Sequence, residues 1–293
     1  MSAVPQVIPY QGSKRRLVPQ ILPFLPSDTA TLHEPFVGSG ALSLGALQAG
    51  AARAVVLGDT LAPLVGIWAL VLDDPERLCA QYTRLWEGQG PDPRRYYDQV
   101  RQDYNQQPDP ARLLFLVARC VKNAVRFNAD GAFNQSPDLR RLGMRPALLR
   151  ARVAAAHALL AGRARAVCRD YAHSLREAGP DDVVYLDPPY LGVSGTRDGR
   201  YHQGLDLARF TTELDQSGQR GVSYLVSFDG RTGERRFGPE LPEALGLRRL
   251  ELAAGRSSQA TLLGRAEQTV ESLYLSPALL QRLGGVGRGA RGR

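Results

Sequence analysis

Apolar positions along the chain fall into two alternating patterns, short continuous runs and longer stretches with a helical period. Short runs rich in Val, Ile and Leu are typical of strands buried on both faces, and a period of 3.6 residues indicates a helix. The sequence therefore predicts strands at 29–34, 54–58, 164–171, 182–186 and 221–228, and helices at 41–49, 61–86 and 207–219. This alternation predicts an α/β fold with a doubly wound, largely parallel sheet.

The middle of the chain, from 91 to 162, has a different pattern. Helical spacing over 111–125 and 146–161 flanks a polar segment in which Asp130-Gly131 lies between aromatic positions, and this predicts a β-hairpin. Arg, Asn and Gln are the side chains that read base edges, and further arginines suit phosphates. The candidate DNA-binding residues are Lys122, Arg126, Asn128, Asn134, Gln135, Arg140 and Arg141. A solvated polar loop is the alternative interpretation.

The strand at 182–186 ends in Asp187-Pro188-Pro189-Tyr190. Two prolines cannot continue a hydrogen-bonded ladder, so the Asp187 carboxylate and the Pro188 carbonyl are left at the sheet edge where ligands bind. These acceptors suit a planar group with an amino substituent, which would donate to both and stack on Tyr190. Taken alone, the stretch fits a strand end with a proline turn about equally well.

A glycine-containing turn, Pro35-Phe36-Val37-Gly38-Ser39-Gly40, follows the first predicted strand, and the second strand ends in Asp59. An acid in that position is placed to accept hydrogen bonds from ribose hydroxyls. Strand, glycine turn, helix, strand and acid together predict a site for an adenosine-containing cofactor. The turn lacks the third glycine of a dinucleotide-binding fingerprint.

The N-terminal segment carries Tyr10-Gln11-Gly12-Ser13-Lys14, with Ser13 as the expected N-cap of a short helix. Free N–H groups at a helix start, beside a glycine and a lysine, suit a carboxylate or a phosphate. A basic helix without a ligand is the simpler interpretation of this stretch when it is taken alone.

Composition changes this picture in three respects. The net charge of +8 favours a polyanionic partner. Lys14 and Lys122 are the only lysines among 37 basic residues, so a site that keeps lysine is expected to need a compact ammonium rather than a guanidinium. The cysteines and histidines lack metal-ligand spacing, and neither a membrane span nor a signal peptide is expected.

Taken together, these motifs resemble the DNA adenine methyltransferase family, the D12-class amino-methyltransferases. The resemblance covers 9–14 as the N-terminal cofactor motif, 35–40 as the glycine motif, Asp59 as the ribose-binding acid, 126–135 as the recognition loop, Asp170-Tyr171 as the cofactor-adenine position and 187–190 as the catalytic motif. This order is the family's α arrangement. The chain departs from the family in its Tyr-Gln-Gly-Ser-Lys motif, because Trp-Ala-Gly-Gly-Lys is commoner in the family. The segment that follows Tyr190 also differs from that of the family.

The resemblance implies a Rossmann-like class I methyltransferase sheet with an inserted, mostly helical target-recognition domain that carries a β-hairpin. It implies S-adenosylmethionine as the cofactor, and the residues that would bind it are Tyr10, Gly12, Pro35, Phe36, Gly38, Ser39, Gly40, Asp59, Asp170 and Tyr171. Catalysis would rest on Asp187, Pro188, Pro189, Tyr190 and Lys14, without a metal. The two acceptors would stabilise an amino nitrogen as it becomes pyramidal, and the target base would be flipped out of the duplex.

The implied reaction is methylation of double-stranded DNA at N6 of adenine. N4 of cytosine presents the same geometry, but Asp in the first position of the catalytic motif favours adenine over cytosine, whose enzymes more often carry Ser. An RNA or protein-glutamine methyltransferase, which commonly has Asn there, and a catalytically silent DNA- or nucleotide-binding protein are the remaining alternatives.

The expected organisation is a catalytic domain formed by 1–88 and 163–283, a target-recognition domain at 89–162 and a disordered Gly/Arg tail at 284–293. The expected partner is double-stranded DNA, with a cognate restriction endonuclease as a further candidate. We expect a monomer in the prokaryotic cytoplasm, associated with the nucleoid.

Overall fold

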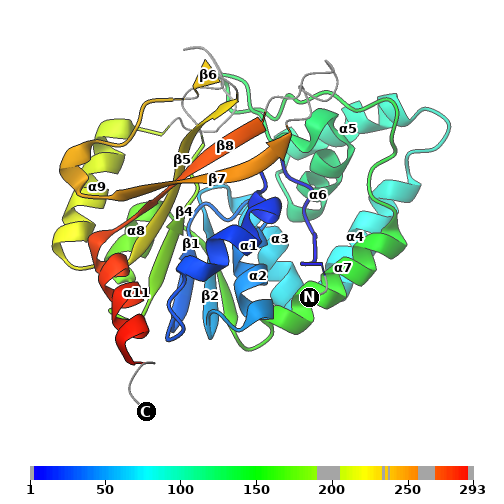
Figure 1. The fold of residues 1–293 in the computed structure, drawn as a ribbon. Helices are drawn as coiled ribbons and strands as arrows, with labels where there is room; N and C mark the ends of the chain where they lie inside the picture. The colour runs from blue at the N-terminus through cyan, green and yellow to red at the C-terminus, as the bar shows by residue number, and fades with distance from the viewer. Residues whose placement is uncertain (1–2, 190–204, 233–234, 237, 257–267, 290–293) are drawn as a thin grey trace.

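The computed structural model describes residues 3–189, 205–232, 235–236, 238–256 and 268–289. Their strands form one sheet in the order β3-β2-β1-β4-β5-β8-β7, and β6 pairs with β5 beside this path (Figure 1). The strands are β1 Thr31–Glu34, β2 Ala54–Asp59, β3 Ala164–Cys168, β4 Val183–Leu186, β5 Tyr224–Thr232, β6 Arg235–Arg236, β7 Arg248–Arg256 and β8 Gln268–Leu275.

Strands β1 to β5 run parallel, whereas β8 runs antiparallel to both of its neighbours, β5 and β7. The chain moves outward from β1 through β2 to β3, and then returns to the other side of β1 with β4 and β5. The strand order therefore reverses between β1 and β4. In open α/β sheets, ligands bind beyond the carboxyl ends of the strands at such a point. This topology confirms the predicted α/β, Rossmann-like sheet.

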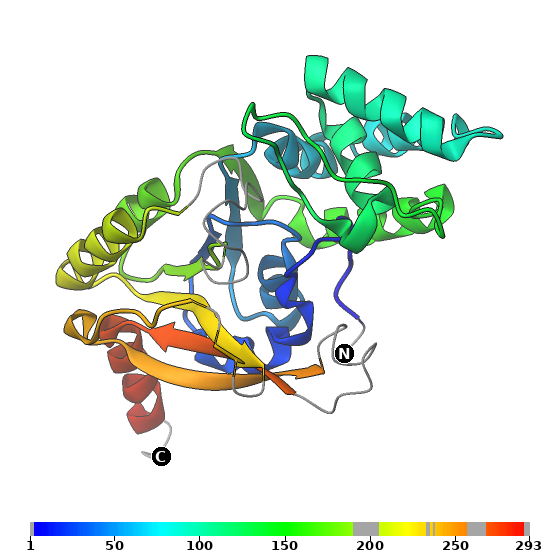
Figure 2. The same cartoon turned by 90° about the horizontal axis from the view of Figure 1, so that it is seen from above.

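Helices cover both faces of the sheet. Seen from above, α8 and α9 lie on one face and α1 to α3 on the other, with the helical part formed by α4 to α7 beyond α3 (Figure 2). The helices are η1 Lys14–Arg16, α1 Val18–Ile21, η2 Leu22–Phe24, α2 Ala41–Ala49, α3 Ala62–Asp73, α4 Pro75–Glu87, α5 Pro93–Gln106, α6 Pro110–Arg119, η3 Val121–Asn123, α7 Pro146–Leu160, α8 Tyr171–Glu177, α9 Leu207–Gln219, η4 Glu243–Leu245 and α11 Pro277–Gly289.

The central strand β4 shows why its sequence is apolar without alternation. Val183 and Tyr185 belong to the larger apolar cluster, whereas Val184 and Leu186 belong to the smaller cluster on the other face. Successive side chains of a strand point to opposite faces, so a strand covered on both sides is apolar at every position.

The helical part lies between β2 and β3 in the sequence and shares the larger apolar cluster with the sheet. Helix α3 packs on β3 and also on α6, and α4 packs on α6 and α7. The fold therefore includes the predicted, mostly helical insertion. Helix α4 packs onto this insertion although it precedes residue 89, the predicted start of the recognition domain.

The predicted helix over 111–125 is wrong beyond Arg119, where α6 ends. Lys122 and Asn123 adopt φ values of 60° and 53°. The Nδ2 of Asn123 donates to the carbonyl of Val117 at 2.9 Å. An asparagine in the left-handed region whose side chain satisfies a terminal carbonyl ends a helix there.

The predicted disordered tail from 284 is wrong in its first part, because α11 continues to Gly289. The start of this helix is docked on the core. Ser276 Oγ accepts a hydrogen bond from the Leu279 backbone N–H at 3.3 Å, and Leu279 is fully buried. Docking of the first turn supplies the nucleus, which is the costly step of helix formation. Residues 290–293 lie outside the described residues.

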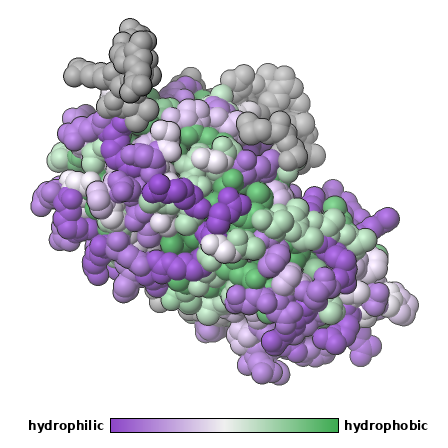
Figure 3. Space-filling view, turned by 90° about the horizontal axis from the view of Figure 1, so that it is seen from below, coloured by the Kyte–Doolittle hydropathy of each residue, from purple (hydrophilic) through white to green (hydrophobic). Residues whose placement is uncertain are grey.

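Hydrophilic side chains cover both ends of the face shown in Figure 3, and apolar side chains gather in a band between them. Among the helices of the described residues, none is long and apolar enough to cross a membrane.

Candidate active site

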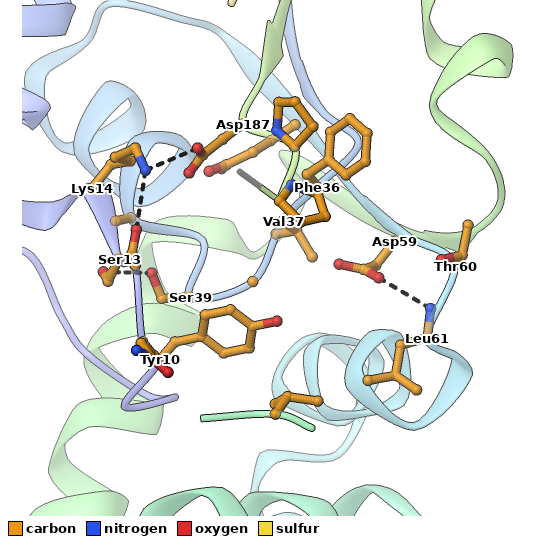
Figure 4. Close-up of a pocket in the computed structure, with 18 of the residues that line it drawn as sticks. Tyr10, Ser13, Lys14, Phe36, Val37, Ser39, Asp59, Thr60, Leu61 and Asp187 are labelled. Atoms are coloured by element: carbon orange, nitrogen blue, oxygen red, sulfur yellow. Dashed lines mark hydrogen bonds and ion pairs between the residues drawn. The ribbon is translucent and has the colours of Figure 1, made fainter. Parts of the chain in front are cut away.

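A pocket lies at the carboxyl ends of β1, β2 and β4, where the strand order reverses (Figure 4). Four sheet-side segments form it: the N-terminal loop, the glycine turn after β1, the end of β2 and the segment after β4. The lining residues are Tyr10, Gln11, Gly12, Ser13, Lys14, Glu34, Phe36, Val37, Gly38, Ser39, Ala41, Asp59, Thr60, Leu61, Val125, Phe127, Asp187, Pro188 and Pro189. Segments that are far apart in the sequence therefore meet in one place, as the motifs predicted.

The glycine turn approaches its neighbours too closely for larger side chains. Gly40, the N-cap of α2, has a φ of 59°, and a Cβ on it would lie 2.7 Å from the ring of Trp68. The same Trp68 donates its indole N–H to the carbonyl of Gly38 at 3.2 Å. A Cβ on Gly38 would lie 3.2 Å from the Tyr10 ring. Glycine at these two positions therefore lets the turn pack against Tyr10 and Trp68, and Gly38 itself lines the pocket.

Ser13 does not cap the helix as expected. No side-chain cap hydrogen bond forms at η1, and the Ser13 hydroxyl instead pairs with the Ser39 hydroxyl at 2.7 Å. This contact ties the N-terminal loop to the glycine turn.

Asp187 follows β4 directly, and its carboxylate lines the pocket beside Pro188 and Pro189. Its Oδ1 lies 2.9 Å from the Nζ of Lys14. Burial raises the pKa of Asp187 to about 6, although the nearby Lys14 ammonium acts to lower it. The group is therefore an ionised acceptor at neutral pH that takes up a proton in mildly acidic solution.

Lys14 is a buried cation, with 6% of its side chain exposed. Its Nζ has three acceptors: Asp187 Oδ1 at 2.9 Å, Glu271 Oε2 at 3.3 Å and the Gly12 carbonyl at 3.3 Å. An ammonium has three donors, and each has an acceptor here. The sequence analysis predicted Lys14 but missed Glu271, which comes from the antiparallel strand β8.

Glu34 at the end of β1 is a second acid that the sequence analysis missed. Its Oε2 accepts hydrogen bonds from the backbone N–H of Ser43 at 3.0 Å and from the Ser43 hydroxyl at 2.5 Å. Burial raises the pKa of Glu34 to about 7. An acid that ends a strand immediately before a glycine turn is the same kind of signal as Asp59, and it could have identified Glu34.

Asp59 ends β2 and lines the pocket as predicted. Its Oδ1 accepts from the backbone N–H of Leu61 at 3.0 Å. Burial raises the pKa of Asp59 to about 6, although hydrogen bonds from the backbones of Leu61, Gly38 and Thr60 act to lower it. A carboxylate held by several backbone donors is fixed in orientation, and it keeps acceptor capacity for hydroxyl groups in the pocket.

Asp170 and Tyr171 do not line the pocket. Asp170 caps α8 through the Ala172 N–H at 3.0 Å and pairs with Arg209 at 2.7 Å. Tyr171 is buried, and its ring stacks on Phe36 with centroids 5.5 Å apart. Because Phe36 does line the pocket, Tyr171 supports the pocket wall. The expected strand over 164–171 ends before these residues.

The predicted β-hairpin forms and reaches the pocket. Phe127 and Phe133 make an antiparallel bridge, and the Gly131 N–H donates to the Asn128 carbonyl at 3.0 Å. Gly131 has a φ of 77°, which a tight turn requires. Phe127 is a pocket residue that the sequence analysis placed in the hairpin without assigning it to the site.

Two predicted base-reading side chains are engaged within the hairpin. The Oδ1 of Asn128 accepts from the Ala132 N–H at 2.8 Å, and the Nε2 of Gln135 donates to the Val121 carbonyl at 3.2 Å. Asn134 is exposed, and Arg126 is half-buried, with its Nε lacking a hydrogen-bond partner among the described residues. Arg126 and Asn134 are therefore the two that a ligand can engage.

The predicted phosphate-binding residues lie on the surface. The Arg140 side chain is 88% exposed and that of Arg141 is 53% exposed, and both pair with the buried carboxylate of Asp138. Lys122 is also exposed. Fixed, exposed guanidinium groups suit phosphate oxygens. Tyr190, the last residue of the predicted catalytic motif, lies outside the described residues.

The described residues contain no cluster of three or more His, Cys, Asp or Glu side chains that could hold a metal ion. The pocket combines three acids with raised pKa values and one buried ammonium, and Phe36 in its wall stacks on Tyr171 behind it. Buried carboxylates of this kind are typical of functional sites.

Comparison with known proteins gives the following matches. A family model described as D12 class N6 adenine-specific DNA methyltransferase matches residues 10–231. The chain is 27% identical over 261 residues to the DNA N-6-adenine-methyltransferase of Escherichia phage P1, and this match covers 86% of the chain but only 33% of the phage protein. It is 26% identical over 243 residues to the DNA adenine methylase of Vibrio cholerae, with 78% of the chain and 82% of that protein covered. It is 24% identical over 252 residues to the type II methyltransferase M.MjaIII of Methanocaldococcus jannaschii, and this match covers 77% of the chain and 86% of that protein.

Proposed function

The chain belongs to the D12 class N6 adenine-specific DNA methyltransferase family, and from this we propose that its pocket transfers a methyl group to N6 of an adenine flipped out of double-stranded DNA. The observation that carries the proposal is the position of Asp187. A buried, ionisable acceptor stands at the carboxyl end of β4, beside Lys14 and in the same pocket as the glycine turn. A base inside a duplex could not reach it, so the base has to leave the stack.

The family requires a methyl donor, and S-adenosylmethionine is the donor that these residues fit. The backbone at Gly38, the carboxylate of Asp59 and the aromatic face of Phe36 suit an adenosine, and Gly40 would hold the turn in place beside them. Tyr10 and Gly12 would border it from the N-terminal loop, and Tyr171 would support Phe36 from behind. When bound, S-adenosylmethionine supplies a methyl group activated by its sulfonium.

Pro35, Ser39 and Asp170 complete the proposed cofactor-binding set. Ser39 would hold the glycine turn against the N-terminal loop through Ser13. Asp170 would act through α8, whose start it caps beside Tyr171. Pro35 would stop β1 immediately before the turn, since proline cannot donate to the ladder.

The residues of the chain account for the activation of the amine. The lone pair of the N6 amino group is delocalised into the ring, and acceptors at Asp187 and at the Pro188 carbonyl favour the pyramidal nitrogen that forms as the bond to the methyl carbon develops. The donor would keep the electron pair of the broken carbon–sulfur bond on its sulfur. The excess N6 proton passes to Asp187, whose pKa near 6 allows its later release to water. Pro189 would stiffen this segment, and Tyr190 would stack on the flipped base.

The hairpin and the basic surface beyond it would bind the duplex. The side chains of Arg126 and Asn134, with the polar residues Asn128 and Gln135 beside them, suit base edges. Lys122, Arg140 and Arg141 suit the phosphate backbone. The same proposal divides the chain into a catalytic domain, formed by 1–88 and 163–283, and a recognition domain inserted at 89–162. Action as a monomer, a cytoplasmic location at the nucleoid and a paired restriction endonuclease remain predictions.

The test is methylation of plasmid DNA by wild type and by Asp187→Asn, followed by mass spectrometry of the nucleosides. We expect N6-methyladenine from wild type and a loss of roughly 10²–10³-fold or more in rate for the variant, since the amide lacks the negative charge that stabilises the developing positive amine and takes up its proton. Cofactor binding measured by calorimetry should be unchanged. Asp181→Asn, at an exposed residue just before β4 and so at the other end of the same strand, is the control. N4-methylcytosine as the product, or wild-type rates for Asp187→Asn, would contradict the proposal.

A further inference from the structure

Glu271 brings a second carboxylate to Lys14 from the far end of the chain. It lies on β8, the strand that runs antiparallel beside β5, and its Oε2 is 3.3 Å from Lys14 Nζ. The exposed fraction of its side chain is 19%, close to the 18% of Asp187. Lys14 thus lies between two partly buried carboxylates that belong to different strands.

The Lys14–Asp187 pair by itself would work against the proposed reaction. An ammonium 2.9 Å from Asp187 Oδ1 neutralises the carboxylate and uses part of its acceptor capacity. It also adds positive charge to a site where the sulfonium and the developing amine are already positive. With Glu271, the three side chains carry one net negative charge instead of none.

We propose that Glu271 is a positioning residue for methyl transfer, which shares the Lys14 ammonium with Asp187 and thereby leaves Asp187 able to accept the target amine. This inference rests on the proposed function. Glu271 acts through Lys14 and contacts neither the base nor the cofactor. Lys14 in turn fixes the orientation of the Asp187 carboxylate through Oδ1.

The charges around Asp187 allow a signature that a purely structural residue would not give. Among the described residues, the charged groups that face Asp187 are Lys14 from η1, Glu271 from β8 and Glu34 from the end of β1. Lys14 lowers the pKa of Asp187, whereas Glu271 and Glu34 act as like charges. Removal of the Glu271 charge should therefore shift the acid limb of the pH–rate profile to lower pH, while the maximal rate falls.

The kinetic test compares Glu271→Gln, Glu271→Asp and the control Glu251→Gln, a substitution on the neighbouring strand β7 at a side chain 44% exposed. We expect Glu271→Gln to lower kcat by about tenfold or more, because a unit charge 3.3 Å from the Lys14 ammonium, which itself pairs with Asp187, is lost. KM for DNA and cofactor affinity should change little. Glu271→Asp should recover part of the rate, and Glu251→Gln should match wild type.

A double-mutant cycle tests whether Glu271 acts through Lys14. Once Lys14→Met has removed the ammonium, Glu271→Gln should cause no further loss of rate. Melting temperatures and cofactor affinities of all variants identify any that fail to fold. Wild-type kcat and an unshifted acid limb for Glu271→Gln would overturn the proposal, and so would losses that add in the double variant.

An NMR measurement that requires no methyl transfer distinguishes this proposal from the proposed function. The chain has two lysines, so protein labelled with ¹⁵N-lysine has two side-chain Nζ resonances, and Lys122 is the exposed reference. Glu271→Gln should move the Lys14 resonance and leave that of Lys122 in place. If wild type methylates no DNA, the proposed function fails, and this arm still measures the contact. An unmoved Lys14 resonance would overturn the contact itself.

Discussion

At the scale of single residues, the pocket concentrates groups that are costly to bury. Lys14 is 6% exposed and Glu34 is 4% exposed, and the pKa values of Glu34, Asp59 and Asp187 are all raised by burial. A buried charge requires pairing and hydrogen bonds, and these groups have them. The fold keeps these charges in one pocket, as expected if the pocket performs chemistry.

Lys14→Arg tests the shape of this site rather than its charge. A guanidinium is larger and planar, and the three acceptors of Lys14 lie within 3.3 Å of a single nitrogen atom. We expect a loss of methyl-transfer rate comparable with that of Lys14→Ala, about 100-fold or more. Arg16→Lys, at an exposed neighbour, should be harmless and serves as the control. Wild-type kinetics for Lys14→Arg would show that charge alone is sufficient.

At the scale of elements, the glycine turn connects β1 to α2 and forms one wall of the pocket. Its conformation depends on glycine at Gly40, where the backbone is left-handed and the Trp68 ring lies directly opposite. Trp68 is fully buried in α3 and also donates to the turn, so the ring has little freedom to move aside.

Gly40→Ala should therefore destabilise the protein by about 2–4 kcal/mol, the sum of left-handed strain and overpacking against Trp68. Affinity for S-adenosylmethionine should fall as the turn is displaced. Gly50→Ala is the matched control, because Gly50 has a similar φ of 68° with no atom within 4 Å of the added Cβ, and only about 1 kcal/mol should be lost. Urea unfolding and calorimetry measure the two effects, and equal losses in both variants would exclude the clash with Trp68.

The hairpin is the second element that carries a prediction. Arg126→Ala should reduce discrimination between target and random duplexes, whereas Asn128→Ala should weaken binding to both, because the Asn128 side chain holds the turn at Ala132. Arg140→Ala should weaken all binding and flatten its salt dependence. Titrations of fluorescent duplexes at two salt concentrations distinguish these outcomes. An equal loss on both duplexes for Arg126→Ala would reduce that residue to a phosphate contact.

At the scale of the whole molecule, Arg282 on α11 joins distant parts of the chain. Its guanidinium donates to the backbone carbonyls of Asp181 at 3.2 Å and Asp182 at 2.9 Å, just before β4, and pairs with Asp28 at 2.9 Å. The C-terminal helix is thereby fixed against the edge of the sheet that lies opposite the carboxyl ends of the strands.

Arg282→Ala should destabilise the protein by about 1–3 kcal/mol, since two backbone carbonyls, one of them partly buried, lose a charged donor. The contact with Asp28 contributes little of this, because an exposed ion pair is weak. Asp28→Asn should therefore change the free energy of unfolding by less than about 0.5 kcal/mol. Urea unfolding of both variants measures the difference, and a larger effect for Asp28→Asn would assign the role to the ion pair instead.

The sequence alone determined the features that depend on a few neighbouring residues. The two prolines after Asp187 end β4, the small residues at 38–40 form the turn into α2, and Asp130-Gly131 folds the hairpin. Apolar runs identified β1, β2, β4 and most of β5. Proline, glycine and hydrophobic periodicity act on the backbone within a few residues, so they can be recognised without knowledge of the fold.

Tertiary structure alone decided which side chains meet. The strand order brings Glu271 of β8 to Lys14 of η1, and no local pattern links these two residues. Asn128 and Gln135 were predicted to contact DNA, yet they are engaged by backbone groups that only the folded hairpin presents. Pairing between polar side chains depends on distances set by the whole chain, and burial then decides the charge that each group carries.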